Sequence, residues 1–147
     1  MNLVRIPTSN ADEVWNLVKK DIAEALSFSG NQTDADFVYE SIKSEKMQLW
    51  VLWDKEQPTP TEKYYGVVVT EIIQRKLKRS CHVFIMTGRS RQKWTPLIKV
   101  LEDFAIEQEC NQMELFARPG WQKVLQNFKY KRTHIVLEKQ LIKKEKI

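Results

Sequence analysis

Two side chains on predicted strands carry carboxylates that could accept a proton. Glu71 lies in the β-prone run of residues 64–73, and Glu114 lies in the shorter run of residues 112–117. A carboxylate beside a cleft can act as a general base when its surroundings bring its pKa toward neutrality. The alternative for both residues is a solvent-facing or salt-bridged side chain, which is the more frequent role of a strand-borne carboxylate.

A basic loop between a predicted strand and a predicted helix could bind phosphate. Residues 88–96 read Gly-Arg-Ser-Arg-Gln-Lys-Trp-Thr-Pro, and Arg89, Arg91 and Lys93 can offer charge to phosphate oxygens. The N-terminus of the following helix would add its positive dipole. Thr95 is predicted to cap that helix, with Pro96 at its first position. The alternative is that Trp94 and Pro96 only begin a well-packed helix and bind no ligand.

Hydrophobic periodicity predicts the elements that carry these residues. Helices are expected to begin after Ser9, at Thr33 with Asp36 in a capping box and Phe37 on the buried side, at Thr95, and at Pro119. Strands are expected at residues 2–6, 48–53, 64–73, 81–86, 112–117 and 133–141. The order is therefore β-α-α-β-β-β-α-β-α-β. It predicts an α/β (α+β) fold, with a mixed central sheet that has at least one parallel pair and helices on both faces.

The composition is that of an ordinary globular domain. Its 147 residues are 42% apolar, which suits a single domain of residues 1–142 with a charged tail at 143–147. No apolar run approaches the roughly 20 residues that a membrane span needs, and the first residues do not resemble a secretory signal. The protein is therefore expected in a cytoplasm, with a virus particle as the alternative. Cys81 and Cys110 are expected to be reduced and buried.

Two other kinds of site receive little support from the sequence. Neither His82 nor His134 has a ligating neighbour at useful spacing, so no metal site is predicted. The net charge of +5 is gathered in clusters that could meet nucleic acid, a phosphorylated cofactor or an acidic protein. Acidic residues are interspersed with them, so solvated faces are the simpler explanation, and nucleic-acid binding ranks last. The clusters are residues 75–79, 89–93, 129–132 and 143–146.

The element order resembles that of the GNAT superfamily of N-acetyltransferases over nearly the whole chain. The resemblance is more specific in residues 83–141, where a strand ends in the basic loop and a helix and short strand lead to Arg118-Pro119-Gly120-Trp121. Asn127-Phe128 stands where the family often has Gly-Phe, and the last predicted strand ends at residues 137–141. Together with Trp94, this pattern is similar to small GNAT-like proteins of tailed bacteriophages.

The resemblance implies that acetyl-CoA binds between the strands at 81–86 and 112–117. The family's R/Q-x-x-G-x-G/A motif, laid on Arg91, puts Trp94 at the first glycine and Pro96 at the second. Trp94 adds bulk, and Pro96 removes a backbone donor that would face the pyrophosphate. The residues that the resemblance assigns to the coenzyme are Met86, Thr87, Arg89, Arg91, Lys93, Trp94, Thr95 and Leu97.

The same resemblance implies a Glu general base and a Tyr that protonates the leaving thiolate. Lys123 stands where that Tyr is expected, Tyr130 is near but out of register, and Glu71 and Glu114 are the strand-borne carboxylates near the expected cleft. The implied function is acetyl-CoA-dependent N-acetylation of an unknown small-molecule or protein amine. The alternative is a non-catalytic GNAT-like phage protein that binds a phage or host protein, as a virion-associated or host-interaction module.

Overall fold

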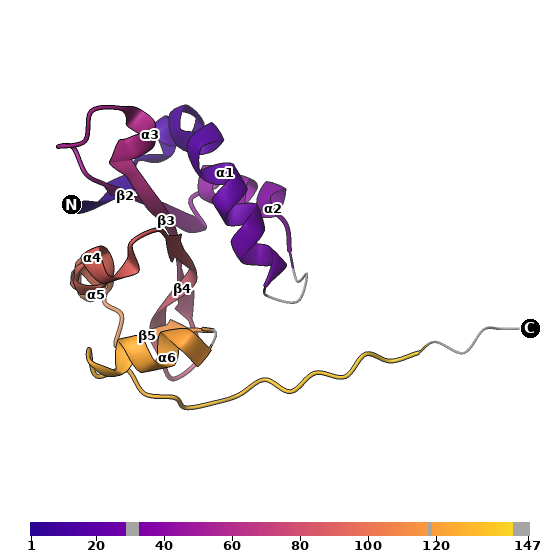
Figure 1. The fold of residues 1–147 in the computed structure, drawn as a ribbon. Helices are drawn as coiled ribbons and strands as arrows, with labels where there is room; N and C mark the ends of the chain where they lie inside the picture. The colour runs from indigo at the N-terminus through magenta and orange to yellow at the C-terminus, as the bar shows by residue number, and fades with distance from the viewer. Residues whose placement is uncertain (29–32, 118, 143–147) are drawn as a thin grey trace, which may run out of the picture. The chain divides into compact units, whose positions relative to one another are not determined.

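The computed structural model describes residues 1–28, 33–117 and 119–142 (Figure 1). The chain divides into two compact units, Met1–Phe116 and Ala117–Ile147. Among the described residues, no helix is long and apolar enough to cross a membrane.

A five-stranded mixed sheet forms the centre of the first unit (Figure 1). The strands are β1 (Asn2–Ile6), β2 (Met47–Trp53), β3 (Tyr64–Gln74), β4 (Arg79–Gly88) and β5 (Gln112–Leu115), and their spatial order follows their order in the chain. The first three pairs are antiparallel. The β4–β5 pair is parallel, as the strand–helix–strand pattern predicts, because a parallel pair needs a crossover connection.

Helices cover both faces of this sheet, and the side-chain alternation along β2 and β3 shows why. Leu49 and Val69 pack in a core with helices α1 (Ala11–Ser27) and α2 (Ala35–Lys43). On the other face, the Trp50 ring meets Phe104 of α5 (Ile98–Glu107) edge to face at 5.1 Å. Successive side chains of a strand point to opposite faces, so strands that are apolar throughout are buried on both. The predicted mixed sheet with helices on both faces is confirmed.

The second helix begins one residue later than predicted. Asp34 has an extended backbone, and its carboxylate accepts the N–H of Phe37 at 2.9 Å, so Asp34 rather than Thr33 is the cap. The helix ends at Lys43. Phe37 is 52% exposed, so its predicted burial is wrong. Val38 and Ile42, four residues apart, face the core instead.

The helix after β4 also begins differently from the prediction. The chain turns helical at α4 (Arg91–Trp94), continues as the 3-10 turn η2 (Thr95–Leu97), and enters α5 at Ile98. Thr95 is not its cap, because the Thr95 hydroxyl donates to the Arg91 carbonyl at 2.6 Å. Burial of the Trp94 side chain anchors the extra turn before Thr95.

The second unit contains α6 (Pro119–Gln126), whose end is closed by bonds from the Phe128 and Tyr130 N–H groups to the Leu125 carbonyl. The predicted strand at residues 133–141 is wrong, because the described residues after 130 form neither helix nor strand. Leu137 is 85% exposed. A β-prone run becomes a strand only with a hydrogen-bonded neighbour, which this segment lacks among the described residues. Arg118 and the tail at 143–147 lie outside those residues.

Two further short helices complete the described elements, η1 (Thr8–Asn10) and α3 (Pro60–Lys63). Pro60 is the first residue of α3, a position that suits proline because its missing N–H has no partner there in a helix. Thr59 caps α3, because its hydroxyl accepts the Glu62 N–H at 3.2 Å and donates to the Glu62 carboxylate at 2.9 Å.

Candidate active site

Strands β4 and β5 pair over only part of the length of β4. The paired stretch runs from Ser80 beside Gln112 to Val83 beside Leu115. Beyond Val83, β4 continues to Gly88 with no strand partner on that side among the described residues. Unpaired backbone groups along a strand edge can hydrogen-bond an extended ligand. The two strands therefore form a split that opens after Val83.

A β-bulge lies at the same place. Val69 of β3 pairs with Ile85 and Thr70 pairs with Val83, so Phe84 is an extra residue in β4. A bulge bends its strand and re-aims the side chains beside it. The bend in β4 therefore coincides with the point at which β5 leaves it.

A row of three ionisable side chains crosses the sheet just before the split. Glu71 of β3 lies opposite His82 of β4, and His82 lies opposite Glu114 of β5. Residues directly opposite on neighbouring strands share a face and interact. The structure thus brings both predicted candidate bases to one row and places between them a histidine that the sequence interpretation had considered only as a metal ligand.

Arg75, in the turn between β3 and β4, holds Glu114 in place. The guanidinium Nη1 and Nη2 each donate to one carboxylate oxygen of Glu114 at 2.8 Å. Burial on its own raises the pKa of Glu114, but the hydrogen bonds and charge of Arg75, together with the adjacent His82 ring, outweigh it and lower that pKa. Glu114 is therefore ionised at neutral pH, as an ion-paired carboxylate should be. The predicted alternative of a salt-bridged Glu114 is confirmed.

The His82 ring is buried, with 7% of its side chain exposed. Its Nδ1 lies 3.1 Å from Glu114 Oε1 but is not aligned for a hydrogen bond, so the contact is electrostatic. Burial lowers the pKa of His82 more than the nearby Glu114 charge raises it. His82 is consequently neutral at pH 7. Glu71 has no charged partner of this kind in the described part of the chain, and burial raises the pKa of its carboxyl group.

The lowered pKa of His82 predicts a pH dependence of stability. The unfolded chain takes up a proton on His82 near its ordinary pKa of 6.5, where the folded chain does not. The free energy of unfolding should therefore be fully retained above pH 6.5 and fall as the pH drops below it. Urea unfolding at about pH 7.5 and about pH 5.5 measures this difference. The difference in the free energy of unfolding between the two pH values should shrink in His82→Gln. It should persist in His134→Gln, which removes the exposed histidine. Equal differences in both variants would contradict the assignment to His82.

Cys81 directly precedes His82 but cannot serve as its nucleophilic partner. Both cysteines are free, and Cys81 is buried. Burial raises the pKa of the Cys81 thiol to about 12, with a smaller contribution from Cys110. A thiol with such a pKa carries almost no thiolate at neutral pH.

The basic loop after β4 is fixed by contacts to β3. The Arg89 guanidinium stacks on the Tyr65 ring at 3.8 Å and donates to the Glu62 carbonyl at 2.6 Å. The Trp94 indole N–H donates to the Arg89 carbonyl at 2.8 Å. Of the three predicted phosphate-binding cations, Arg89 is therefore directed toward β3 and α3. Arg91 and Lys93 are exposed, with Lys93 Nζ 5.9 Å from the centre of the Tyr65 ring.

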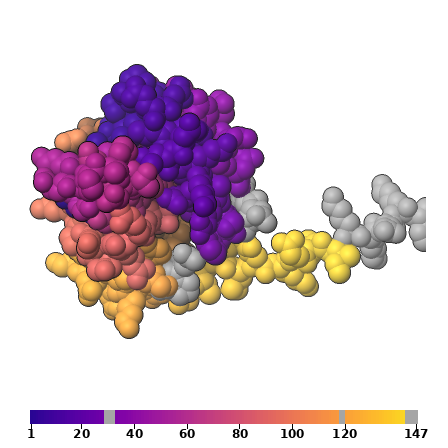
Figure 2. All heavy atoms as spheres, turned by 45° about the horizontal axis from the view of Figure 1, so that its top comes forward, coloured from indigo at the N-terminus to yellow at the C-terminus, as the bar shows by residue number. Residues whose placement is uncertain are grey.

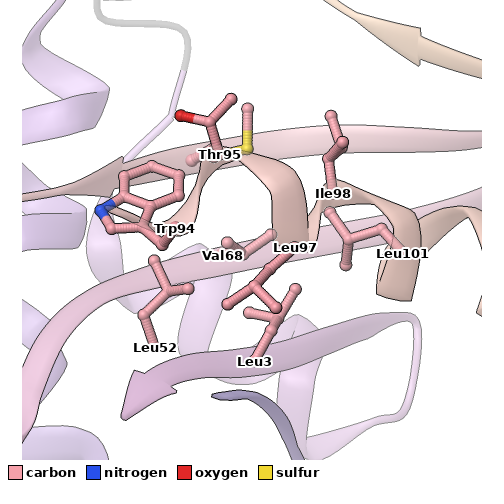
Figure 3. Close-up of a pocket in the computed structure, with 9 residues that line it drawn as sticks. Leu3, Leu52, Val68, Trp94, Thr95, Leu97, Ile98 and Leu101 are labelled. Carbon is pink, nitrogen blue, oxygen red and sulfur yellow. The ribbon is translucent and has the colours of Figure 1, made fainter. Parts of the chain in front are cut away.

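Four of the residues assigned to the coenzyme line an apolar cavity inside the first unit (Figure 3). Its volume is about 10 Å³, roughly the room for one water molecule. Trp94 lies near Leu52 at this cavity on the α5 face of the sheet (Figure 3), and no residue of β5 lines the cavity. The four residues are Met86, Trp94, Thr95 and Leu97.

Thr87 and Arg89 border a different space, a solvent-open hollow of about 340 Å³ between α1 and the adjoining ends of β3 and β4. Asp21 of α1 lines it and accepts the Tyr64 hydroxyl at 2.6 Å. Burial and this bond raise the pKa of the Tyr64 phenol. Figure 2 shows the magenta atoms of α3 and its preceding loop beside the indigo atoms of α1, which borders this hollow.

The structure is similar to solved acetyltransferases over nearly its full length. Ribosomal-protein-alanine N-acetyltransferase from Brucella melitensis matches with a TM-score of 0.61 and 14% identity, over 97% of this chain and 99% of that one. Glucosamine-6-phosphate N-acetyltransferase from Arabidopsis thaliana matches with a TM-score of 0.63 and 14% identity, over 96% and 98%. A tetramutant of the BH1408 protein from Bacillus halodurans matches with a TM-score of 0.68 and 11% identity, over 96% and 100%.

The chain therefore has the fold of the GNAT acetyltransferases. No family model matches the sequence, and no curated protein matches it. The likeness at these identities is one of fold, and the function has to be argued from the site.

Proposed function

We propose that this protein binds acetyl-CoA in the split between β4 and β5 and transfers the acetyl group to an amine. The observation that carries the proposal is the split itself, in which the edge of β4 is left unpaired after Val83 while Phe84 bulges. The pantetheine arm of coenzyme A is extended and carries two amides. Such an arm can hydrogen-bond to the open β4 edge as an added strand would.

The positive charge after the end of β4 indicates in which direction the coenzyme would lie along the strand. The strand runs from Val83 toward Gly88, and the exposed cations Arg91 and Lys93 follow directly. A ligand that lies along β4 with its thioester near the bulge would bring its phosphates to these cations. Charge-assisted hydrogen bonds from Arg and Lys are the strong contacts that phosphates make in proteins.

Trp94 and Pro96, which stand at the two glycine positions of the family motif, would alter the phosphate site without blocking the split. The Trp94 side chain is 2% exposed and packs on the α5 face, so its bulk lies away from the split. Pro96 still lacks the N–H that a glycine would supply. This loss favours the second candidate, a GNAT-fold protein that has lost catalysis and binds a phage or host protein. A measurement of acetyl-CoA binding distinguishes the acetyltransferase from the non-catalytic binding protein.

The double substitution Arg91→Ala with Lys93→Ala is expected to weaken acetyl-CoA binding by about a hundredfold or more. Each hydrogen bond to a charged phosphate contributes about 1.5–3 kcal/mol, and about 1.4 kcal/mol corresponds to tenfold in Kd. Calorimetric titration measures the change. The matched control is Lys19→Ala with Lys20→Ala, which removes two exposed cations from α1. Equal affinities in both double variants would remove the loop from the proposed site.

A further inference from the structure

We infer that His82, rather than Glu71 or Glu114, is the general base of this site, and that Glu114 is the residue that positions it. The inference rests on the proposed acetyl-CoA reaction and names the group that takes the proton from the acceptor. Three observations carry it: the place of the ring at the split, the short distance from its Nδ1 to Glu114, and the charged groups around it.

The His82 ring lies at the opening of the split. Its aromatic neighbours are Phe116, with ring centroids 4.9 Å apart, and Phe84, at 6.2 Å. Phe84 and Phe116 are the first residues beyond the last β4–β5 pair, which joins Val83 to Leu115. A histidine that lies near both of these rings is therefore next to the point at which the β4 edge becomes available to a thioester.

The carboxylate of Glu114 influences which nitrogen of His82 accepts a proton. His82 Nδ1 lies 3.1 Å from Glu114 Oε1, and the negative charge of this oxygen would repel a lone pair on Nδ1. The charge of Glu114 therefore favours the neutral tautomer that carries its hydrogen on Nδ1 and leaves Nε2 as the basic atom. Arg75 donates a hydrogen bond to each oxygen of Glu114 and so fixes the position of the carboxylate. Because these bonds stabilise the ionised form, Glu114 is itself a poor base.

The charged groups around His82 suit a base that works at neutral pH. Glu114 of β5 and Arg75 of the β3–β4 turn act on it in opposite senses, and Glu71 of β3 lies opposite it. On the same face of the sheet, α1 contributes the apolar residues Val18, Ile22 and Leu26 to the core. A neutral, buried imidazole beside a fixed carboxylate is a common arrangement for accepting a proton from an attacking nucleophile.

The chemical step balances with these residues alone. The amine nitrogen attacks the thioester carbonyl carbon and gives its proton to His82 Nε2. The C–S bond then breaks, the acetyl group stays on nitrogen, and the thiolate takes the proton back from His82 Nε2 to become the free thiol of coenzyme A. With no amine present, water can attack in the same way and yields acetate and the same thiol.

The test uses this slow hydrolysis, so that it needs no knowledge of the natural amine. The full-length protein is incubated with acetyl-CoA, and thiol release is measured from about pH 5 to about pH 9. The rate of the wild-type protein should fall toward low pH as His82 becomes protonated. His82→Gln should lose about 100-fold or more of the rate, as expected for a general base, and its pH dependence. His134→Gln is the matched control and should retain both.

Glu114→Gln tests the positioning role through the pH profile of thiol release, which a loss of folded protein alone would not shift. Loss of the negative charge lowers the pKa of His82 further, so the acid limb of the rate profile should move to lower pH as the rate falls. Unchanged thiol release in His82→Gln with normal acetyl-CoA binding would overturn the inference and leave the proposed function standing. Acetyl-CoA binding without thiol release by the wild-type protein would overturn the inference and leave only the binding part of the proposed function standing. Absence of acetyl-CoA binding would overturn both.

Discussion

Trp94→Ala should lower the free energy of unfolding by about 3–5 kcal/mol, the range for removing a buried aromatic ring. The Trp94 side chain is 2% exposed and packs beside Leu52 and Val68, where a small cavity already exists and would grow (Figure 3). The substitution also removes the donor that the Arg89 carbonyl accepts from. Urea unfolding at about pH 7.5 measures the effect.

Trp94→Phe is the control for this prediction. It keeps most of the apolar volume and loses the 2.8 Å bond to Arg89, so a cost of about 1–3 kcal/mol is expected from a carbonyl left unpaired and a smaller ring. A Trp94→Ala protein as stable as the wild type would show that the indole is not part of the core. Trp94 would then be available to a ligand, as the family motif implies.

Gly66→Ala should destabilise the protein by about 1–3 kcal/mol, the usual cost of overpacking a close contact. Gly66 of β3 lies directly opposite Gly88 of β4, so two residues without side chains face one another at the end of the pair. A Cβ on Gly66 would lie 2.7 Å from the Gly88 Cα and would also clash with the Thr87 carbonyl oxygen. The strands would have to separate beside the basic loop that starts at Arg89.

Gly120→Ala provides the matched control, because a Cβ at Gly120 in α6 would meet nothing within 4 Å. In a helix this exchange is neutral or stabilising by up to about 1 kcal/mol. The midpoint of urea unfolding should therefore fall in Gly66→Ala and stay or rise in Gly120→Ala. Equal midpoints for Gly66→Ala and the wild type would mean that β3 and β4 do not approach so closely at the glycine pair.

The elements and their order could be predicted because burial leaves a clear pattern in the sequence. Strands β2, β3 and β4 are continuous apolar runs, as expected for strands buried on both faces. The helix ends were harder to predict, since Thr33 and Asp34 are both good caps and only the local backbone selects one. The strand at 133–141 was predicted wrongly, because β propensity does not provide a partner.

The arrangement of the candidate site could not be predicted from the sequence, because it too depends on contacts between distant residues. Glu71, His82 and Glu114 are far apart in sequence, and only the register of three strands places them in one row. The bulge at Phe84 has no sequence signal of its own, and neither has the inward turn of Trp94. The chemical types of the side chains could thus be read from the sequence, whereas their pairing depends on the sheet.

A calorimetric titration of the full-length protein with acetyl-CoA tests the central claim most directly. The proposal predicts saturable binding of one molecule per chain. It also predicts a rise in Tm, because a ligand at about 100 times its Kd stabilises a protein by about 2.7 kcal/mol. No heat of binding and no change in Tm at millimolar acetyl-CoA would contradict the proposal. The GNAT fold of this chain would then support a different function.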